Sequence, residues 1–354
     1  MEFKNDWERA KERFCAFWQG ELVDRCCFAV TAWKDGKAVE YPFPKEAEAC
    51  RRHWMDEEYI IQRNENIMRA SYYGGESFPA IFVNLGAAGH AGFFKGAKYR
   101  FTDSYWSTPS LEDLDALEFD EQSELYQKTL SLAEAFVQAA KGRYFVSMPD
   151  STGNADALAH LYGSGNLLMD MIEEPQAVER ALRKIEPVYE QTMLAVFERV
   201  RANNEGGGVV QWLSTWAPGL HAQMQCDLSC MISPQMFERF ILPELEAQCA
   251  LLEYPLYHLD GMEQIRHLDA LLSIPRLKAI QWTQVAGQRP ATAYLPELRR
   301  IQAAGKNLVI LVEPEQIRPL MEGLSSKGLF LVARADDQEQ AERMLRDVER
   351  YTHE

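Results

Sequence analysis

The chain contains eight short apolar runs, each followed by a stretch with helical periodicity, and most of the runs end in a polar or aromatic residue. The runs lie at 26–33, 80–86, 143–150, 209–216, 255–261, 279–285, 307–312 and 328–334. Strands that are apolar on both faces indicate a parallel sheet covered by helices, because a one-sided sheet would alternate with polar residues. Eight such strands interleaved with helices predict an α/β fold, a closed (β/α)8 TIM barrel.

The segments between the runs complete this architecture. The charged amphipathic segment 1–14 predicts an N-terminal helical extension, and 47–73 reads as one long helix. Residues 86–119, rich in glycine and aromatics, predict an insertion after strand 2, and 151–172 predict another after strand 3. Because we see no linker and no repeat, we expect 1–354 to form a single barrel domain.

The carboxyl ends of the strands of such a barrel hold its chemistry. At the end of the fifth run, His258 and Asp260 stand two residues apart and therefore project from the same face of the strand. Polar groups that replace apolar ones where a strand ends predict a catalytic pair. The alternative is that Asp260 caps the next helix and His258 is a hydrogen-bonded residue of the rim.

The ends of the other strands supply aromatic and polar side chains that suit a small organic substrate. We expect the substrate-binding set to comprise Trp33, Asn84, Asp150, Trp212, Trp216, His221, Trp282, Gln284 and Arg334. The tryptophans could equally plug the barrel mouth. Arg334 could pair with Asp336 or Asp337 instead of an anion. Glu313 ends the seventh run, where a glutamate also complements a helix dipole.

Composition narrows the classes of partner. The 53 acidic and 37 basic residues give a net charge of −16, which disfavours binding to nucleic acids and anionic membranes. No apolar stretch approaches the roughly 20 residues of a membrane helix, and the N-terminus lacks a signal-peptide core, so we expect a cytoplasmic protein. Seven cysteines without framework spacing indicate reduced thiols.

One part of the chain resembles a known superfamily. The stretch CDLSCMISPQMFERFILPELEAQ at 226–248, followed by YHLDG at 257–261, is similar to uroporphyrinogen decarboxylases and their corrinoid-dependent methyltransferase relatives. GELVDR at 20–25 resembles the segment that leads into their first strand. Over most of the chain the resemblance lies in the order of helices and strands. Only residues 226–261 resemble the superfamily in a moderately specific way. It implies a (β/α)8 barrel.

Departures from the superfamily pattern argue against uroporphyrinogen as the substrate. TAWKDGK at 31–37 lacks the arginines that grip the acidic tetrapyrrole, and Asn84 stands near the position of an aspartate at the end of strand two. VARADD at 332–337 replaces a Gly-His element. Without the arginine clamp, a substrate with many carboxylates would be poorly neutralised.

The methyltransferase relatives bind zinc through a His-x-Cys pair on strand five and a cysteine after strand eight. His258 matches the histidine, whereas Asp260 stands at the first cysteine position and Ala333 or Arg334 near the second. If a divalent metal such as zinc binds here, His258, Asp260 and Glu313 would offer a harder nitrogen and oxygen set.

The resemblance favours a methyltransferase-like enzyme that moves a methyl group between a small molecule and a corrinoid or related carrier, with the corrinoid supplied by a partner protein. Relatives often form homodimers, and this chain could do the same. One alternative is a decarboxylase, a lyase acting on a smaller substrate. Another is a carbohydrate-processing or ligand-binding barrel in which Asp150 acts with Asp260 or Glu313. A non-catalytic interaction protein remains a further alternative.

Overall fold

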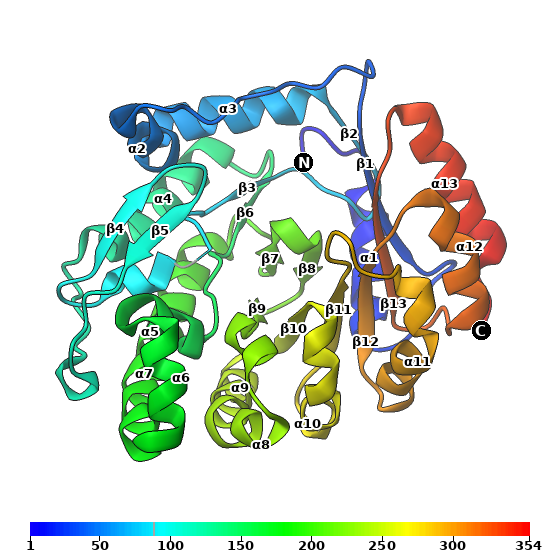
Figure 1. The fold of residues 1–354 in the computed structure, drawn as a ribbon. Helices are drawn as coiled ribbons and strands as arrows, with labels where there is room; N and C mark the ends of the chain where they lie inside the picture. Colours follow the sequence, from blue (N-terminus) through cyan, green and yellow to red (C-terminus); the bar gives the residue numbers. More distant parts are fainter. Residues whose placement is uncertain (88) are drawn as a thin grey trace.

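The computed structural model describes residues 1–87 and 89–354 (Figure 1). Its strands are β1 (Cys27–Trp33), β2 (Ser71–Gly75), β3 (Ala80–Phe82), β4 (Lys98–Phe101), β5 (Tyr105–Thr108), β6 (Phe145–Ser147), β7 (Gly208–Val210), β8 (Thr215–Ala217), β9 (His221–Met224), β10 (Tyr254–Asp260), β11 (Ala279–Thr283), β12 (Asn307–Leu311) and β13 (Leu329–Arg334). Its α-helices are α1 (Trp7–Trp18), α2 (Ala47–Met55), α3 (Glu57–Ala70), α4 (Glu124–Ala140), α5 (Asn154–Tyr162), α6 (Ser164–Glu173), α7 (Pro175–Val200), α8 (Pro234–Met236), α9 (Leu242–Leu251), α10 (Leu268–Ser273), α11 (Leu295–Ala303), α12 (Pro314–Gly323) and α13 (Gln338–Tyr351).

The fold is mixed α/β around a seven-stranded sheet with the order β2-β1-β13-β12-β11-β10-β9. All neighbours in this sheet run parallel except β2, which is antiparallel to β1. A separate parallel pair, β3 and β6, lies across from it, and the helices lie around the outside of the strands (Figure 1). No helix in the described ranges is long and apolar enough to cross a membrane.

The prediction of a closed barrel is wrong in one respect, because the strand ladder of the described residues does not close into a ring. The fourth apolar run is not one strand. It is split into β7, a 3-10 turn (η3, Gln211–Leu213) and β8, which folds back antiparallel to β7. The next strand, β9, therefore pairs with β10 in its place. Single backbone bonds bridge the interruption, from Met148 N to Val209 O (2.8 Å) and from Gly208 N to Gly219 O (2.8 Å).

Local sequence signals explain several element boundaries. The long helix expected over 47–73 is broken at Asp56, whose carboxylate accepts the Tyr59 N–H (2.9 Å) and starts α3. The segment then turns into β2, which sequence patterning missed. Ser233 and Asp337 cap α8 and α13 by accepting backbone N–H bonds.

Both predicted insertions contain regular structure. Residues 86–119 include the β4–β5 hairpin, and 151–172 include α5 and most of α6.

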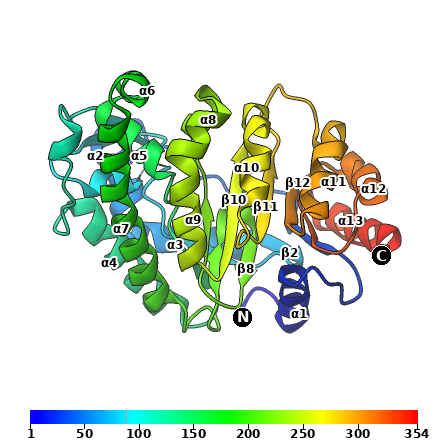
Figure 2. The same ribbon diagram turned by 90° about the horizontal axis from the view of Figure 1, so that it is seen from below.

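The inner core is closed at the amino ends of the strands by α1. Trp7, Phe14 and Phe17 of this helix are buried among inward-facing strand residues such as Phe330. The indole of Trp18 donates to the Trp216 carbonyl (2.9 Å). Helix α1 thus lies across one end of the strands (Figure 2). The polar residues that end the strands are left at the opposite end, which we call the mouth.

Candidate functional site

His258 and Asp260 lie on the inward face of β10, as the strand alternation predicted. The preceding inward residue, Leu256, belongs to the inner core, while Tyr257 and Leu259 pack outward against the helices. His258 is 7% exposed, and its Nε2 lies 3.9 Å from Asp260 Oδ2. The two residues that sequence analysis nominated as catalytic are therefore neighbours at the mouth.

The neighbours of His258 fix which ring nitrogen is basic. Register pairs His258 with Gln281 of β11, and His258 Nδ1 is hydrogen-bonded to Gln281 Oε1. An amide oxygen only accepts, so Nδ1 carries the proton and Nε2 is left as the basic nitrogen that faces Asp260. Thr283 Oγ1 lies 3.0 Å from the same amide oxygen and donates to it.

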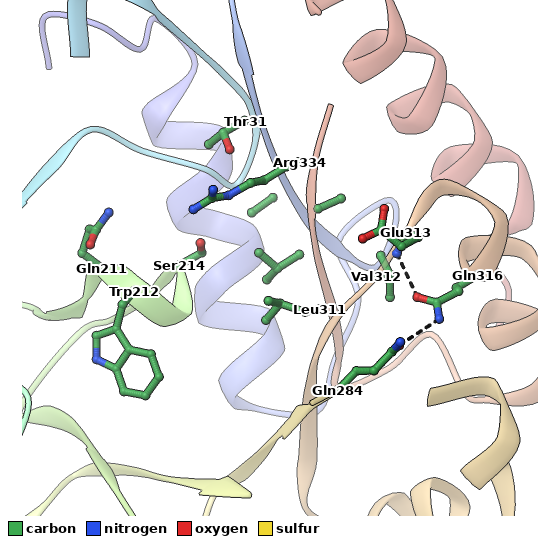
Figure 3. A pocket seen from close by; sticks show the side chains of 13 residues that line it. Thr31, Gln211, Trp212, Ser214, Gln284, Leu311, Val312, Glu313, Gln316 and Arg334 are labelled. Carbon is green, nitrogen blue, oxygen red and sulfur yellow. Dashed lines mark hydrogen bonds between the residues drawn. The ribbon is translucent and has the colours of Figure 1, made fainter. Parts of the chain in front are cut away.

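A cavity of about 430 Å³ opens beside this pair at the carboxyl ends of β1, β12 and β13. Trp212 connects the cavity with the His258–Asp260 pair. It lines the cavity, and its ring meets the His258 ring edge-on with the ring centroids 4.8 Å apart. Most of the other residues in the wall are polar or come from strand ends (Figure 3): Ala29, Thr31, Gln211, Ser214, Gln284, Leu311, Val312, Glu313, Gln316, Val332, Ala333 and Arg334. This volume suits a small organic ligand.

Arg334 supplies the positive charge of the cavity. Its guanidinium points toward the side that Gln211 and Ser214 line (Figure 3), and within the described residues it forms no hydrogen bond or ion pair. The alternative pairing with Asp337 is not formed, since that carboxylate caps α13. The guanidinium is thus available for an anionic group of a ligand.

Gln284 is held in the cavity wall by a short relay. Gln316 Oε1 accepts the backbone N–H of Glu313 (2.8 Å), and Gln316 Nε2 donates to Gln284 Oε1 (3.1 Å), as the dashed lines in Figure 3 mark. The relay leaves the Gln284 amide nitrogen free to orient as a donor toward a ligand.

The turn between β7 and β8 contributes backbone strain to the same wall. Ser214 has φ of 58°, a left-handed conformation that costs a non-glycine residue about 1–2 kcal/mol. Its N–H donates to the Gln211 carbonyl (2.9 Å), which closes the turn. Strain of this kind is retained where the surrounding structure fixes it, often at binding sites.

Carboxyl groups with raised pKa values lie near the His258–Asp260 pair, outside the cavity wall. Asp150, which follows β6, accepts from Gln223 Nε2 (3.0 Å), and burial together with the Asp227 charge raises the pKa of Asp150 to about 7. Asp227 is exposed at the mouth, where partial desolvation and the Asp156 charge raise its pKa to about 7. Two carboxyls that titrate near neutral pH can donate or accept protons there.

Asp156 positions this acidic group. Its carboxylate accepts the backbone N–H groups of Gly153 (3.1 Å), Asp227 (2.9 Å) and Leu228 (2.8 Å). Burial raises the pKa of Asp156, while the three donors favour its ionised form. Asp156 therefore ties the start of α5 to the segment that presents Asp227.

Three residues predicted to bind substrate lie in packed surroundings instead. Trp216 is fully buried in the inner core near α1, with its ring against Trp7. Trp282 alternates outward from β11 into the layer beneath the helices. His221 begins β9 at the amino end, where its ring nitrogens bond to Thr215 Oγ1 (2.8 Å) and to the Tyr254 carbonyl (2.6 Å), and burial lowers its pKa to about 4. These three predictions are corrected, because a residue at the amino end or on the outward face cannot reach the mouth.

The structure does not bring Trp33 and Asn84 into the cavity wall. Trp33 pairs with Ser71 of β2 at the rim, and Asn84 Oδ1 accepts the Gly86 N–H (2.7 Å) within its own loop. Of the nine residues predicted to contact substrate, Trp212, Gln284 and Arg334 line the cavity. Asp150 is not part of its wall and lies near Asp227 instead.

The predicted metal set is not assembled. His258 and Asp260 are adjacent, whereas Glu313 lines the cavity from the start of α12. Across residues 1–87 and 89–354, no group of three or more His, Cys, Asp or Glu side chains is placed to hold a metal ion. The side chains present at the mouth therefore do not fit a zinc centre.

Sequence reasoning missed four cavity residues, Thr31, Gln211, Ser214 and Gln316. Thr31 was detectable, since it shares the inward face of its strand with Ala29. Gln211 and Ser214 enter the wall only because the fourth run breaks into a turn, which no local pattern indicated.

Comparison with known proteins supports the fold. A methyltransferase from Methanosarcina mazei has a similar structure, with a TM-score of 0.61 over 96% of this chain and 98% of that chain, at 12% sequence identity. At this identity the similarity establishes a shared fold only. No family model matches the chain, and no curated protein matches it significantly.

Proposed function

We propose that the protein is a methyltransferase-type enzyme that binds a small molecule in the mouth cavity and exchanges a methyl group with a corrinoid or related carrier. The observation that carries the proposal is the contact of Trp212 with both the cavity and His258, which sets a basic nitrogen against a small-ligand site. The fold shared with a methyltransferase supports the reaction class.

We place the two reactants differently in this proposal, because the cavity is small. About 430 Å³ suits the small methyl-bearing molecule, with an anionic group on Arg334 and an apolar part against Trp212. The carrier would reach the open mouth on a partner protein. When bound, a reduced corrinoid supplies the nucleophile that accepts a methyl group.

The residues of the mouth would manage the proton that the reaction requires. When the bond between the methyl carbon and its heteroatom breaks, the heteroatom keeps the electron pair and must gain a proton. Asp150 or Asp227 could donate it, because their pKa values of about 7 keep part of each group protonated at neutral pH. In the reverse direction, His258 Nε2 would remove a proton from the attacking thiol or amine.

The test offers free cob(I)alamin to the purified protein together with methylated thiols, methylated amines and methoxylated carboxylic acids. We expect at least one class to consume cob(I)alamin in a protein-dependent way, measured by its absorbance. His258→Ala should lower this rate about 10²–10⁴-fold, the usual contribution of a general acid or base. His353→Ala, an exposed histidine near the C-terminus, is the matched control and should be unchanged.

A wild-type protein that consumes no cob(I)alamin with any donor class would contradict the proposal. Equal rates for His258→Ala and wild type would contradict the role of His258.

A second candidate function is decarboxylation of a small acid, and the observation in its favour is the unpaired guanidinium of Arg334. Arg334 would hold one carboxylate of a substrate while the bond to another breaks and CO2 leaves. The carbanion would take its proton from Asp150 or Asp227. Release of CO2 without any corrinoid would separate this function from methyl transfer.

A further inference from the structure

A second cavity of about 360 Å³ lies between α7 and α9, and it shares no residue with the mouth cavity. Its wall combines apolar side chains with charged ones: Glu179, Leu182, Arg183, Glu186, Arg239, Phe240, Pro243, Glu244 and Ala247. Arg239 is already paired with Glu179 (2.7 Å). Among the described residues, the carboxyls of Glu186 and Glu244 have no cationic partner, and the guanidinium of Arg183 in the same wall forms no ion pair either.

These two carboxyls carry acceptor atoms that nothing satisfies. Glu244 is 6% exposed, and its Oε1 accepts the Asn154 N–H (3.0 Å) while its Oε2 has no partner among the described residues. Glu186 Oε2 accepts from Gln248 Nε2 (3.2 Å) and from the Asn154 amide, whereas Glu186 Oε1 has none. Asn154 Oδ1, which lies between them, is also without a donor in the described structure.

Leaving such groups unpaired is costly, because a buried acceptor without a donor loses its hydration with nothing in return. Burial raises the pKa of Glu186 to about 7, and burial together with the Glu186 charge raises the pKa of Glu244 well above its ordinary value. Burial therefore favours the neutral form of both carboxyls. A cation placed between them would favour their ionised form instead.

Both helices that form the cavity are irregular beside it. Pro187 lies inside α7, directly after Glu186, and removes the N–H that would bond to the Arg183 carbonyl. On the other side, the segment η5 (Phe237–Ile241) is a π-helix, and the Leu242 N–H bonds to the Phe237 carbonyl, one residue further back than in an α-helix. Short π-helical segments are frequent at functional sites.

We propose that this cavity binds a small primary alkylammonium ion. An ammonium group has three N–H donors, and the carboxyls of Glu186 and Glu244, which both line the cavity and each have one oxygen without a donor among the described residues, are acceptors of the opposite charge. The alkyl chain would lie against Leu182 and Phe240. A metal ion is a poorer occupant, since the described residues contain no group of three metal-binding side chains.

Binding should release protons, because the ammonium ion favours the ionised form of both carboxyls. The other charged groups that face them are Glu179, Arg183 and Glu190 of α7, Arg239 of η5 and Asp156 of α5. Arg239 is paired with Glu179, and the pKa of Glu186 is about 7, so raising the pH from 6 to 8 ionises Glu186 in this group. The affinity should rise over this range.

The test is calorimetric titration of the whole chain with n-butylamine at pH 6 and pH 8, with n-butanol as the uncharged control. We expect saturable butylamine binding that is tighter at pH 8, with proton release seen as different heats in buffers of different ionisation enthalpy. Glu186→Gln and Glu244→Gln should each weaken binding about tenfold, as expected for losing one charge-assisted hydrogen bond. Glu246→Gln, an exposed change on the same helix, should bind as the wild type does.

Ala247→Phe should abolish binding by filling the cavity without altering either carboxyl, so it decides the matter even where Glu244→Gln does not fold. The proposal is overturned by non-saturable butylamine heats, by equal binding of butanol, or by wild-type affinity in Glu186→Gln and Ala247→Phe.

Discussion

The inward side chains at the amino ends of the strands are apolar, whereas those at the carboxyl ends of the same strands are polar or charged. At the amino ends, inward residues such as Phe330 and Trp216 are fully buried under α1. At the carboxyl ends, the same inward rows finish in His258, Asp260 and Arg334, around an open cavity. Apolar packing at one end thus stabilises the fold, which permits unsatisfied and strained groups at the other.

Two tryptophans of the fourth apolar run, Trp212 and Trp216, give the largest expected difference in stability. Trp216→Ala removes a fully buried indole from the inner core and should lower the free energy of unfolding by about 3–5 kcal/mol. Trp212→Ala, only four residues earlier but at the half-buried cavity wall, should cost much less and affect the proposed methyl transfer instead. Urea unfolding of both variants measures the difference, and equal losses would contradict the division between the two ends.

Arg25 and Arg334 allow a second comparison between the two ends. Arg25 lies just before β1, and Arg334 ends the neighbouring strand β13. Arg25, 4% exposed, binds the fully buried Glu76 through two bonds of 2.7 and 3.0 Å. Arg25→Met would leave that carboxylate buried without this partner and should destabilise by about 3–5 kcal/mol in urea unfolding. Wild-type stability in this variant would show that Glu76 is neutralised in another way, through Arg13.

The pKa of Asp150 gives a smaller, pH-dependent effect. Its folded pKa of about 7 exceeds the value of about 4 in an unfolded chain, so ionisation opposes folding. This penalty is fully present above pH 7 and disappears as the pH falls from 7 to 4.

Asp150→Asn should therefore be more stable than the wild type at pH 8 by about 1–2 kcal/mol, allowing for partial exposure, and equal to it near pH 4. Asp347→Asn, an exposed change on α13, should show no such dependence. A constant difference across pH would mean that the effect of Asp150→Asn does not come from ionisation.

Arg334→Met should give the smallest change in stability, within about 0.5 kcal/mol, because the guanidinium has no protein partner to lose. Thermal unfolding beside Arg25→Met measures this directly. A loss of several kcal/mol would show that Arg334 serves the fold rather than a ligand.

The placement of His258 and Asp260 side by side was predictable because strand alternation is local and needed only one correct strand. The same rule could not decide whether Gln281 or Trp282 of β11 faces inward. That choice depends on the register between β10 and β11, which pairs His258 with Gln281. The interruption of the ring at Ser214 was equally invisible, because no residue pattern in the fourth apolar run indicated the turn that lets β9 pair with β10 in its place.

The position of α1 has a consequence for how the molecule is made. This helix is synthesised before the strands that it covers, yet its aromatic residues contact Phe330 of β13, more than three hundred positions later. Contacts so far apart in sequence form slowly, and domains are synthesised from their N-terminus. An amphipathic, tryptophan-bearing segment of the nascent chain therefore stays exposed until β13 has been synthesised, and chaperones that bind exposed apolar segments would find a target there.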